Sequence, residues 1–242
     1  MMRRLIAFIY RRKNMKSIIS RFALALISAL AVPFSLAQDV GPDVLLKATT
    51  SEVISIIRQD PDIQAGDPGK VAELVEARIL PLFDFPRMTQ SAVARNWRLA
   101  TPEQQKTLTS EYKTLLVRTY SVALSSYRDQ VVEYRPLRAA PDATEVTVKS
   151  DLKQPGRESM TIDYDMEKTG AGWKVYDIKI AGISMVTAYR DAFASRVRDG
   201  GIEGLIKSLS DKNRQGDGRL RSRREGPVYV AVIVRSALQG VR

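Results

Sequence analysis

The chain has 242 residues, a formal net charge of +11, and neither cysteine nor histidine. Without these two residue types it can form no disulfide, no zinc site of the His/Cys type, and no hydrolase centre that needs a histidine base. The charge excess lies at the two ends, because residues 38–215 carry 25 basic and 25 acidic residues. A neutral central region argues against binding nucleic acid through a basic surface.

Residues 1–37 have the pattern of a secretory signal peptide. They contain seven basic and no acidic residues, and an apolar run over residues 22–36 leads to small side chains at Ser35 and Ala37. This pattern predicts cleavage after Ala37. The run is shorter than the roughly 20 residues that a membrane-spanning helix needs, so an anchor is the weaker interpretation. Met15 is a more natural start, which would make residues 1–14 an upstream extension of the gene.

Residues 38–215 are long enough for one folded domain with its own core. The tail, residues 216–242, is basic and then apolar, and the sequence does not explain it. Apolar residues at helical spacing predict helices over residues 42–59, 70–80, 87–97 and 102–128. The last of these has the clearest start, since Thr101 and Gln104 match a capping box and Pro102 suits the first turn.

From residue 131 onward the apolar residues alternate. This predicts four strands, over residues 131–137, 144–152, 159–167 and 173–180, whose short connections require antiparallel pairing. In the fourth strand, alternation puts Val175 on one face and Tyr176, Ile178 and Ile180 on the other. Helices over residues 184–198 and 202–213 follow. The order predicts an α+β fold, with a helical layer packed on one face of a twisted, mostly antiparallel four-stranded sheet.

The sequence Trp-Lys-Val-Tyr-Asp from Trp173 to Asp177, followed by Gly-Ile-Ser-Met-Val from Gly182 to Val186, resembles the MlaC (toluene-tolerance) family of periplasmic phospholipid carriers. The resemblance extends through residues 79–85, 97–102 and 200–205, and so covers roughly residues 42–213. It departs at Ala94, where such carriers often have a glycine.

The resemblance implies a soluble periplasmic protein that carries phospholipid between the outer and inner membranes and thereby maintains the lipid asymmetry of the outer membrane. It also implies two partners, an outer-membrane lipoprotein–porin complex and an inner-membrane ABC transporter with a lipid-binding ring. No catalysis, cofactor or metal is expected. The acyl tails would lie in an apolar cavity between helices and sheet. We expect this cavity to be lined by the inward-facing apolar residues Phe83, Phe85, Leu116, Tyr120, Tyr127, Val148, Met160, Ile162, Tyr164, Val175, Ile183, Met185 and Val186.

Two other functions remain open from the residues alone. One is a small-molecule enzyme on a cone-shaped α+β fold, with Asp163 or Asp165 as a base in an apolar pocket. The other is a periplasmic protein-binding module or chaperone that uses the aromatic face of the long helix. Lipid or peptide that copurifies with the protein would distinguish these functions from the carrier.

Overall fold

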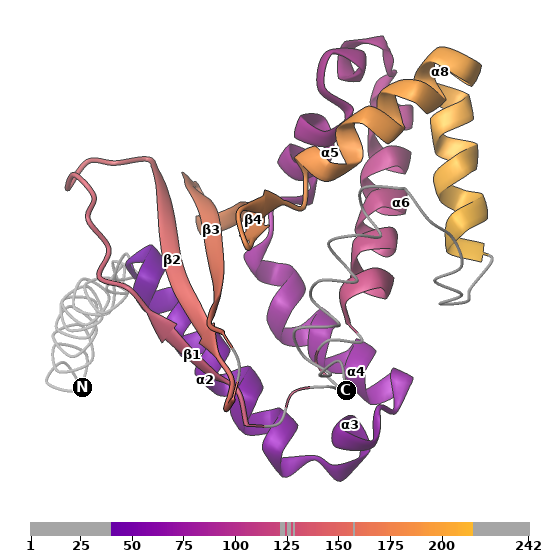
Figure 1. Cartoon of the computed structure of the whole chain (residues 1–242). Coiled ribbons are helices and arrows are strands. Elements are labelled where there is room, and N and C mark those ends of the chain that lie inside the picture. Colours follow the sequence, from indigo (N-terminus) through magenta and orange to yellow (C-terminus); the bar gives the residue numbers. More distant parts are fainter. Residues whose placement is uncertain (1–39, 122–123, 125–126, 128, 157, 215–242) are drawn as a thin grey trace, which may run out of the picture. The chain divides into compact units, whose positions relative to one another are not determined.

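A computed structural model describes residues 40–121, 124, 127, 129–156 and 158–214 (Figure 1). The predictions for residues 1–37 and 216–242 therefore lie outside the described residues. The described residues belong to a compact unit that begins at Val40. Across these ranges, no helix combines the length and the apolar character that crossing a membrane requires.

The first half of the described chain is helical. Its elements are α2 (Pro42–Gln59), α3 (Pro61–Ala65), α4 (Pro68–Leu74), the π-helical turn η1 (Val75–Ile79), the 3-10 turn η2 (Leu80–Leu82), α5 (Phe85–Val93), the 3-10 helix η3 (Ala94–Leu99) and α6 (Pro102–Tyr120). Helix α2 has the predicted bounds. The side chains of Asp60, Asp67 and Asp84 cap α3, α4 and α5 by accepting backbone N–H groups. Helices α4 and α5 therefore begin two residues before their predicted starts.

Helix α5 was predicted to continue to Trp97, but it ends at Val93. Ala94 has φ 54° and ψ −130°, a conformation that breaks the helix and that glycine adopts more readily. The start of α6 is confirmed, because Thr101 and Gln104 form both hydrogen bonds of the capping box. Most of its predicted continuation to residue 128 lies outside the described residues.

The second half forms the sheet and the last helices. Its elements are β1 (Val131–Tyr134), β2 (Glu145–Lys153), β3 (Met160–Thr169), β4 (Gly172–Ile180), β5 (Ile183–Ser184), the 3-10 turn η4 (Thr187–Tyr189) and α8 (Arg190–Arg214). The strands pair antiparallel in chain order, which confirms the predicted meander. The sheet has five strands and not four. Ser184 was predicted to begin a helix, but it belongs to β5 and pairs with Lys179 of β4. Within α8, non-helical backbone at Gly200 and Gly201 separates the two predicted helices.

A β-bulge in β4 corrects the predicted facing of that strand. Asp177 pairs with Asp165 and Val175 pairs with Met166, so Tyr176 is an extra residue. Simple alternation would put Val175 and Ile178 on opposite faces. The bulge leaves Tyr176 without a partner on β3, so Val175 and Ile178 lie on the same face, which packs on the helices. The Tyr176 ring lies instead beneath the Arg87 guanidinium, with 3.6 Å from that group to the ring centroid.

The buried residues form three clusters. Helices α5, α6 and α8 build the first around Tyr112 and Phe193, whose rings meet edge to face. Helices α2 to α4 build the second. In the third, α2 packs on the sheet, with Leu46 against Val148 and Val175. Figure 1 shows α2 alongside β1 and β2, and α6 alongside α8. The fold is α+β, with helices packed on the apolar face of an antiparallel sheet.

Candidate functional site

A cavity of about 350 Å³ lies between the sheet and the helical layer. Helices α2, α5 and α6, the turns η1 and η2, strands β1 to β4 and the turn at Met185 all contribute to its wall. Of the described residues that line it, every one is uncharged. An ion has no partner in such a wall, and removing it from water would cost several kcal/mol. The cavity therefore suits an uncharged, apolar ligand.

The structure places most of the predicted lining residues at this cavity. Those at the wall are Phe83, Phe85, Leu116, Tyr120, Tyr127, Met160, Ile162, Tyr164, Val175 and Met185. Three others lie elsewhere. Val148 is buried between α2 and the sheet, Val186 is buried among the last helices, and Ile183 packs against that same cluster. All three are apolar and pack against other side chains, but none of them lines the cavity.

The aromatic connector before α5 is attached directly to the sheet. The backbone N–H of Asp84 donates to the carbonyl of Val175 at 2.9 Å, and Phe83 forms a parallel bridge with the same residue. The Asp84 side chain also caps α5 by accepting from the N–H of Arg87 at 2.8 Å. These contacts hold Phe83 and Phe85 stacked, with 5.7 Å between ring centroids, in the cavity wall.

A buried carboxylate holds the turn that presents Met185. Asp177 accepts hydrogen bonds from the Ser184 hydroxyl at 2.5 Å and from the Val186 N–H at 3.2 Å. Burial raises the pKa of Asp177, and these two hydrogen bonds partly offset the shift. The Tyr112 hydroxyl also donates to the Met185 carbonyl at 3.3 Å. The backbone of Met185 is thus fixed while its side chain faces the cavity.

The polar atoms of the wall are hydroxyls. Thr50 and Tyr134 share a hydrogen bond of 2.6 Å at the α2 side. The Tyr120 hydroxyl is buried and has no hydrogen-bond partner among the described residues. Burial raises its pKa, and the neighbouring Tyr189 hydroxyl raises it further. Burial likewise raises the pKa of Tyr164. Both phenols are therefore neutral at physiological pH.

Sequence reasoning missed a whole wall of the cavity, which helix α2 supplies. Its residues there are Leu46, Thr49, Thr50, Val53, Ile54 and Ile57. Their spacing of three and four was visible, but it indicates only that one helix face is buried and not what that face meets. Ile178 and Ile180 were missed for another reason, since the bulge at Tyr176 reverses the face expected for them.

The described residues contain no group of three or more acidic side chains placed to hold a metal ion. The two candidate bases of the enzyme alternative are also absent from the cavity wall. Asp165 pairs with Lys179 at 2.7 Å and accepts from the Thr147 hydroxyl at 2.7 Å. Asp163 lies 3.9 Å from the Lys149 ammonium. Both carboxylates take part in ion pairs on the polar face of the sheet.

Residues 47–211 match the protein family described as MlaC protein. The chain belongs to the MlaC family. The toluene tolerance protein ttg2D of Pseudomonas putida is 25% identical over 188 residues, which cover 77% of this chain and 86% of that protein. The intermembrane phospholipid transport system binding protein MlaC of Haemophilus influenzae is 20% identical over 192 residues, covering 78% of this chain and 90% of that protein.

A solved structure is also similar to this member of the MlaC family. It is the phospholipid-binding protein of Ralstonia solanacearum in complex with a phospholipid. That protein is 42% identical, with a TM-score of 0.67, and the match covers 72% of this chain and 97% of the other. This chain therefore shares its fold with a protein whose structure was solved with phospholipid bound.

Proposed function

We propose that this protein is a periplasmic phospholipid carrier that moves lipid between the outer and inner membranes. It encloses the acyl tails in the cavity between sheet and helices and leaves the head group toward solvent. The observation that carries the proposal is the wall itself, which is apolar, uncharged and built from both layers of the fold. The lipid complex of the Ralstonia solanacearum relative and the name of the Haemophilus influenzae relative support it.

The energetics of lipid transfer require such an enclosure. Exposing a methylene group to water costs about 0.8 kcal/mol, so the roughly thirty methylenes of two tails cost on the order of 20 kcal/mol. A carrier must offset most of this cost without using charge, because the tails offer none. An engineered apolar cavity of about 150 Å³ holds one benzene. The cavity of about 350 Å³ therefore holds only part of two long tails, and loading must widen it or use space next to it.

The location and partners are part of this proposal. The predicted signal peptide supports the periplasm. We assign the two partners that family resemblance implies, an outer-membrane lipoprotein–porin complex and an inner-membrane ABC transporter with a lipid-binding ring, and the role of maintaining outer-membrane lipid asymmetry. The relative from Haemophilus influenzae is named as the binding protein of a transport system, which agrees with a carrier that is not an enzyme.

The direct test is to identify what the protein carries. The full chain is expressed in a Gram-negative bacterium and purified from the periplasmic fraction without detergent. The purified protein is extracted with organic solvent, and the extract is analysed by mass spectrometry. We expect near-stoichiometric glycerophospholipid. Recovery of peptide in its place would favour the protein-binding module, and an extract free of both would end the carrier proposal.

A pair of neighbouring variants makes the test specific to the cavity. Ile162 lines the cavity, whereas Thr161, the preceding residue on β3, is not part of its wall. Ile162→Glu puts a charge where the tails would lie and should abolish copurified lipid, because a carboxylate is costly to bury in an apolar site. Thr161→Glu adds the same charge on the same strand and should leave lipid occupancy unchanged. Equal loss in both variants would contradict the assignment of the wall.

A further inference from the structure

A groove between α2 and the edge strand β1 continues outward from the cavity. Its volume is about 480 Å³. Three of its residues, Ile54, Tyr127 and Val132, also belong to the cavity wall, so the two spaces share a boundary. The remaining residues of the groove are mostly polar: Ser51, Ser55, Arg58, Gln59, Gln130 and Val131. The lining thus changes from apolar in the cavity to mostly polar in the groove on the other side of these three shared residues.

Arg58 is the one charged residue among the described residues that line this groove. Its guanidinium lies over the Tyr127 ring, with 5.9 Å to the centroid. Among the ion pairs of the described residues, none involves Arg58. On either side of Arg58 in the sequence, Ser55 and Gln59 are joined by a hydrogen bond of 2.9 Å. The groove therefore holds a cation that has no ion pair among the described residues and that lies near a ring of the cavity wall.

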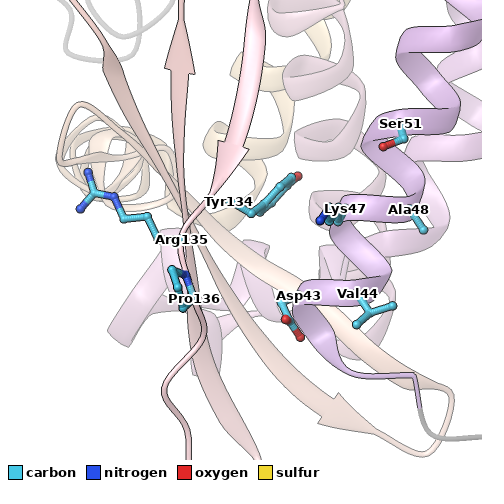
Figure 2. A pocket seen from close by; sticks show the side chains of 8 residues that line it. All are labelled: Asp43, Val44, Lys47, Ala48, Ser51, Tyr134, Arg135 and Pro136. Carbon is cyan, nitrogen blue, oxygen red and sulfur yellow. The ribbon is translucent and has the colours of Figure 1, made fainter.

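A second groove on the same helix provides a contrast. Its volume is about 520 Å³, and Figure 2 shows Lys47 and Asp43 on α2 near Tyr134. This groove has no residue in common with the cavity wall. Its arginine, Arg135, is bound by the Asp151 carboxylate at 2.6 and 2.8 Å and extends away from α2. Because this second groove shares no wall with the cavity, we do not expect Lys47 to contact the head group of a lipid whose tails lie in the cavity.

We propose that Arg58 binds the phosphate group of the lipid while the tails occupy the cavity. This inference rests on the proposed carrier function. An amphiphile with enclosed tails must leave its phosphate at the mouth of the cavity, where water or a cation can still contact it. The planar guanidinium matches phosphate oxygens with two parallel hydrogen bonds, and Arg58 lies within cation–π range of the Tyr127 ring. The carrier therefore prefers a phosphorylated lipid to a neutral one with the same tails.

The test compares two ligands that differ only in the head. Dioctanoyl phosphatidylglycerol and dioctanoylglycerol are titrated as monomers into delipidated full-length protein, so that no membrane is present. Wild type should bind the phospholipid roughly three- to tenfold more tightly, because a solvent-exposed charge contact contributes modestly. Arg58→Ala should remove this preference without changing affinity for the neutral lipid. Arg58→Lys should retain part of it. Free glycerol phosphate, which lacks tails, should not compete.

Lys47→Ala is the matched control, since it removes an exposed cation from the same helix and leaves the preference unchanged in our proposal. If Lys47→Ala reduced the preference as much as Arg58→Ala, the preference would come from nonspecific attraction between the phosphate and the positive charges of α2. That result would overturn the proposed contact at Arg58. If Arg58→Ala weakened both ligands equally, Arg58 would act only by supporting Tyr127. Equal binding of the two lipids by wild type would overturn the phosphate contact and leave the carrier intact. Binding of neither would overturn the carrier itself. Competition by glycerol phosphate alone would identify an anion site independent of lipid.

Discussion

Two adjacent leucines on α6 offer a way to measure whether the interior is hollow. Leu115 and Leu116 are both 5% exposed, but only Leu116 is part of the cavity wall. Both belong to the first buried cluster, where Leu115 packs among other side chains and has no part in the cavity wall. We consider Leu→Phe at each position in delipidated protein. The same substitution at neighbouring positions enters an empty space in one case and a filled one in the other.

The expected effects have opposite signs. Phenylalanine has three more side-chain carbons than leucine, and burying each extra carbon contributes about 0.8 kcal/mol, so Leu116→Phe should stabilise the protein by up to about 2 kcal/mol. Overpacking a filled core costs roughly 1–3 kcal/mol, so Leu115→Phe should destabilise it. An empty cavity of about 350 Å³ costs at most about 8 kcal/mol at roughly 24 cal/mol per Å³. This cost is larger than the gain of about 2 kcal/mol expected from filling part of the cavity with the phenylalanine ring.

The assay is equilibrium urea unfolding of the two variants and wild type after lipid extraction, with copurified lipid measured before extraction. Leu116→Phe should raise the free energy of unfolding and lower lipid occupancy. Leu115→Phe should lower the free energy of unfolding and leave occupancy unchanged. If both substitutions destabilised the protein to the same extent, protein atoms would already fill the space at Leu116, and the cavity would not exist in solution.

Two further predictions concern backbone strain and a buried acid. Ala94→Gly should raise the free energy of unfolding by about 1 kcal/mol, because it relieves the positive φ of 54°, whereas Ala92→Gly within α5 should lower it; thermal unfolding of both variants checks this. Because burial raises the pKa of Asp177, its stabilising contribution is present below the ordinary aspartate pKa of about 4 and is lost as the pH rises through the raised folded value. Asp177→Asn should therefore gain stability relative to wild type as the pH rises above about 4. A stability difference in urea unfolding that does not change with pH would refute this.

Features encoded by a few neighbouring residues could be predicted from the sequence. The start of α6 is local, since Thr101 and Gln104 satisfy each other, and its position was correct. The starts of α4 and α5 were also encoded locally, by the capping residues Asp67 and Asp84, but the predicted helices began two residues later. Strand β5 could not be predicted, because two residues have no periodicity and pair only where β4 offers an edge.

The candidate site shows a different limit. Alternation and helical spacing identify inward-facing side chains, and most of the predicted lining residues do reach the cavity. Whether an inward residue meets empty space or a neighbour depends on elements distant in the sequence. Val148 faces inward on β2, as predicted, yet Leu46 of α2 covers it. The placement of α2 on the sheet is set by packing between residues about a hundred positions apart, and no local pattern records it.

The surplus residue of β4 bends that strand locally, as β-bulges do. A strand from Trp173 to Ile180 that lacked Tyr176 would alternate regularly and would still turn Val175, Ile178 and Ile180 toward the helices. Facing is therefore not what the additional residue provides. A bulge bends its strand and increases the local twist, so Tyr176 adds curvature to a strand that forms part of the cavity wall. A chain shortened by that one residue should keep its inward side chains and hold less lipid.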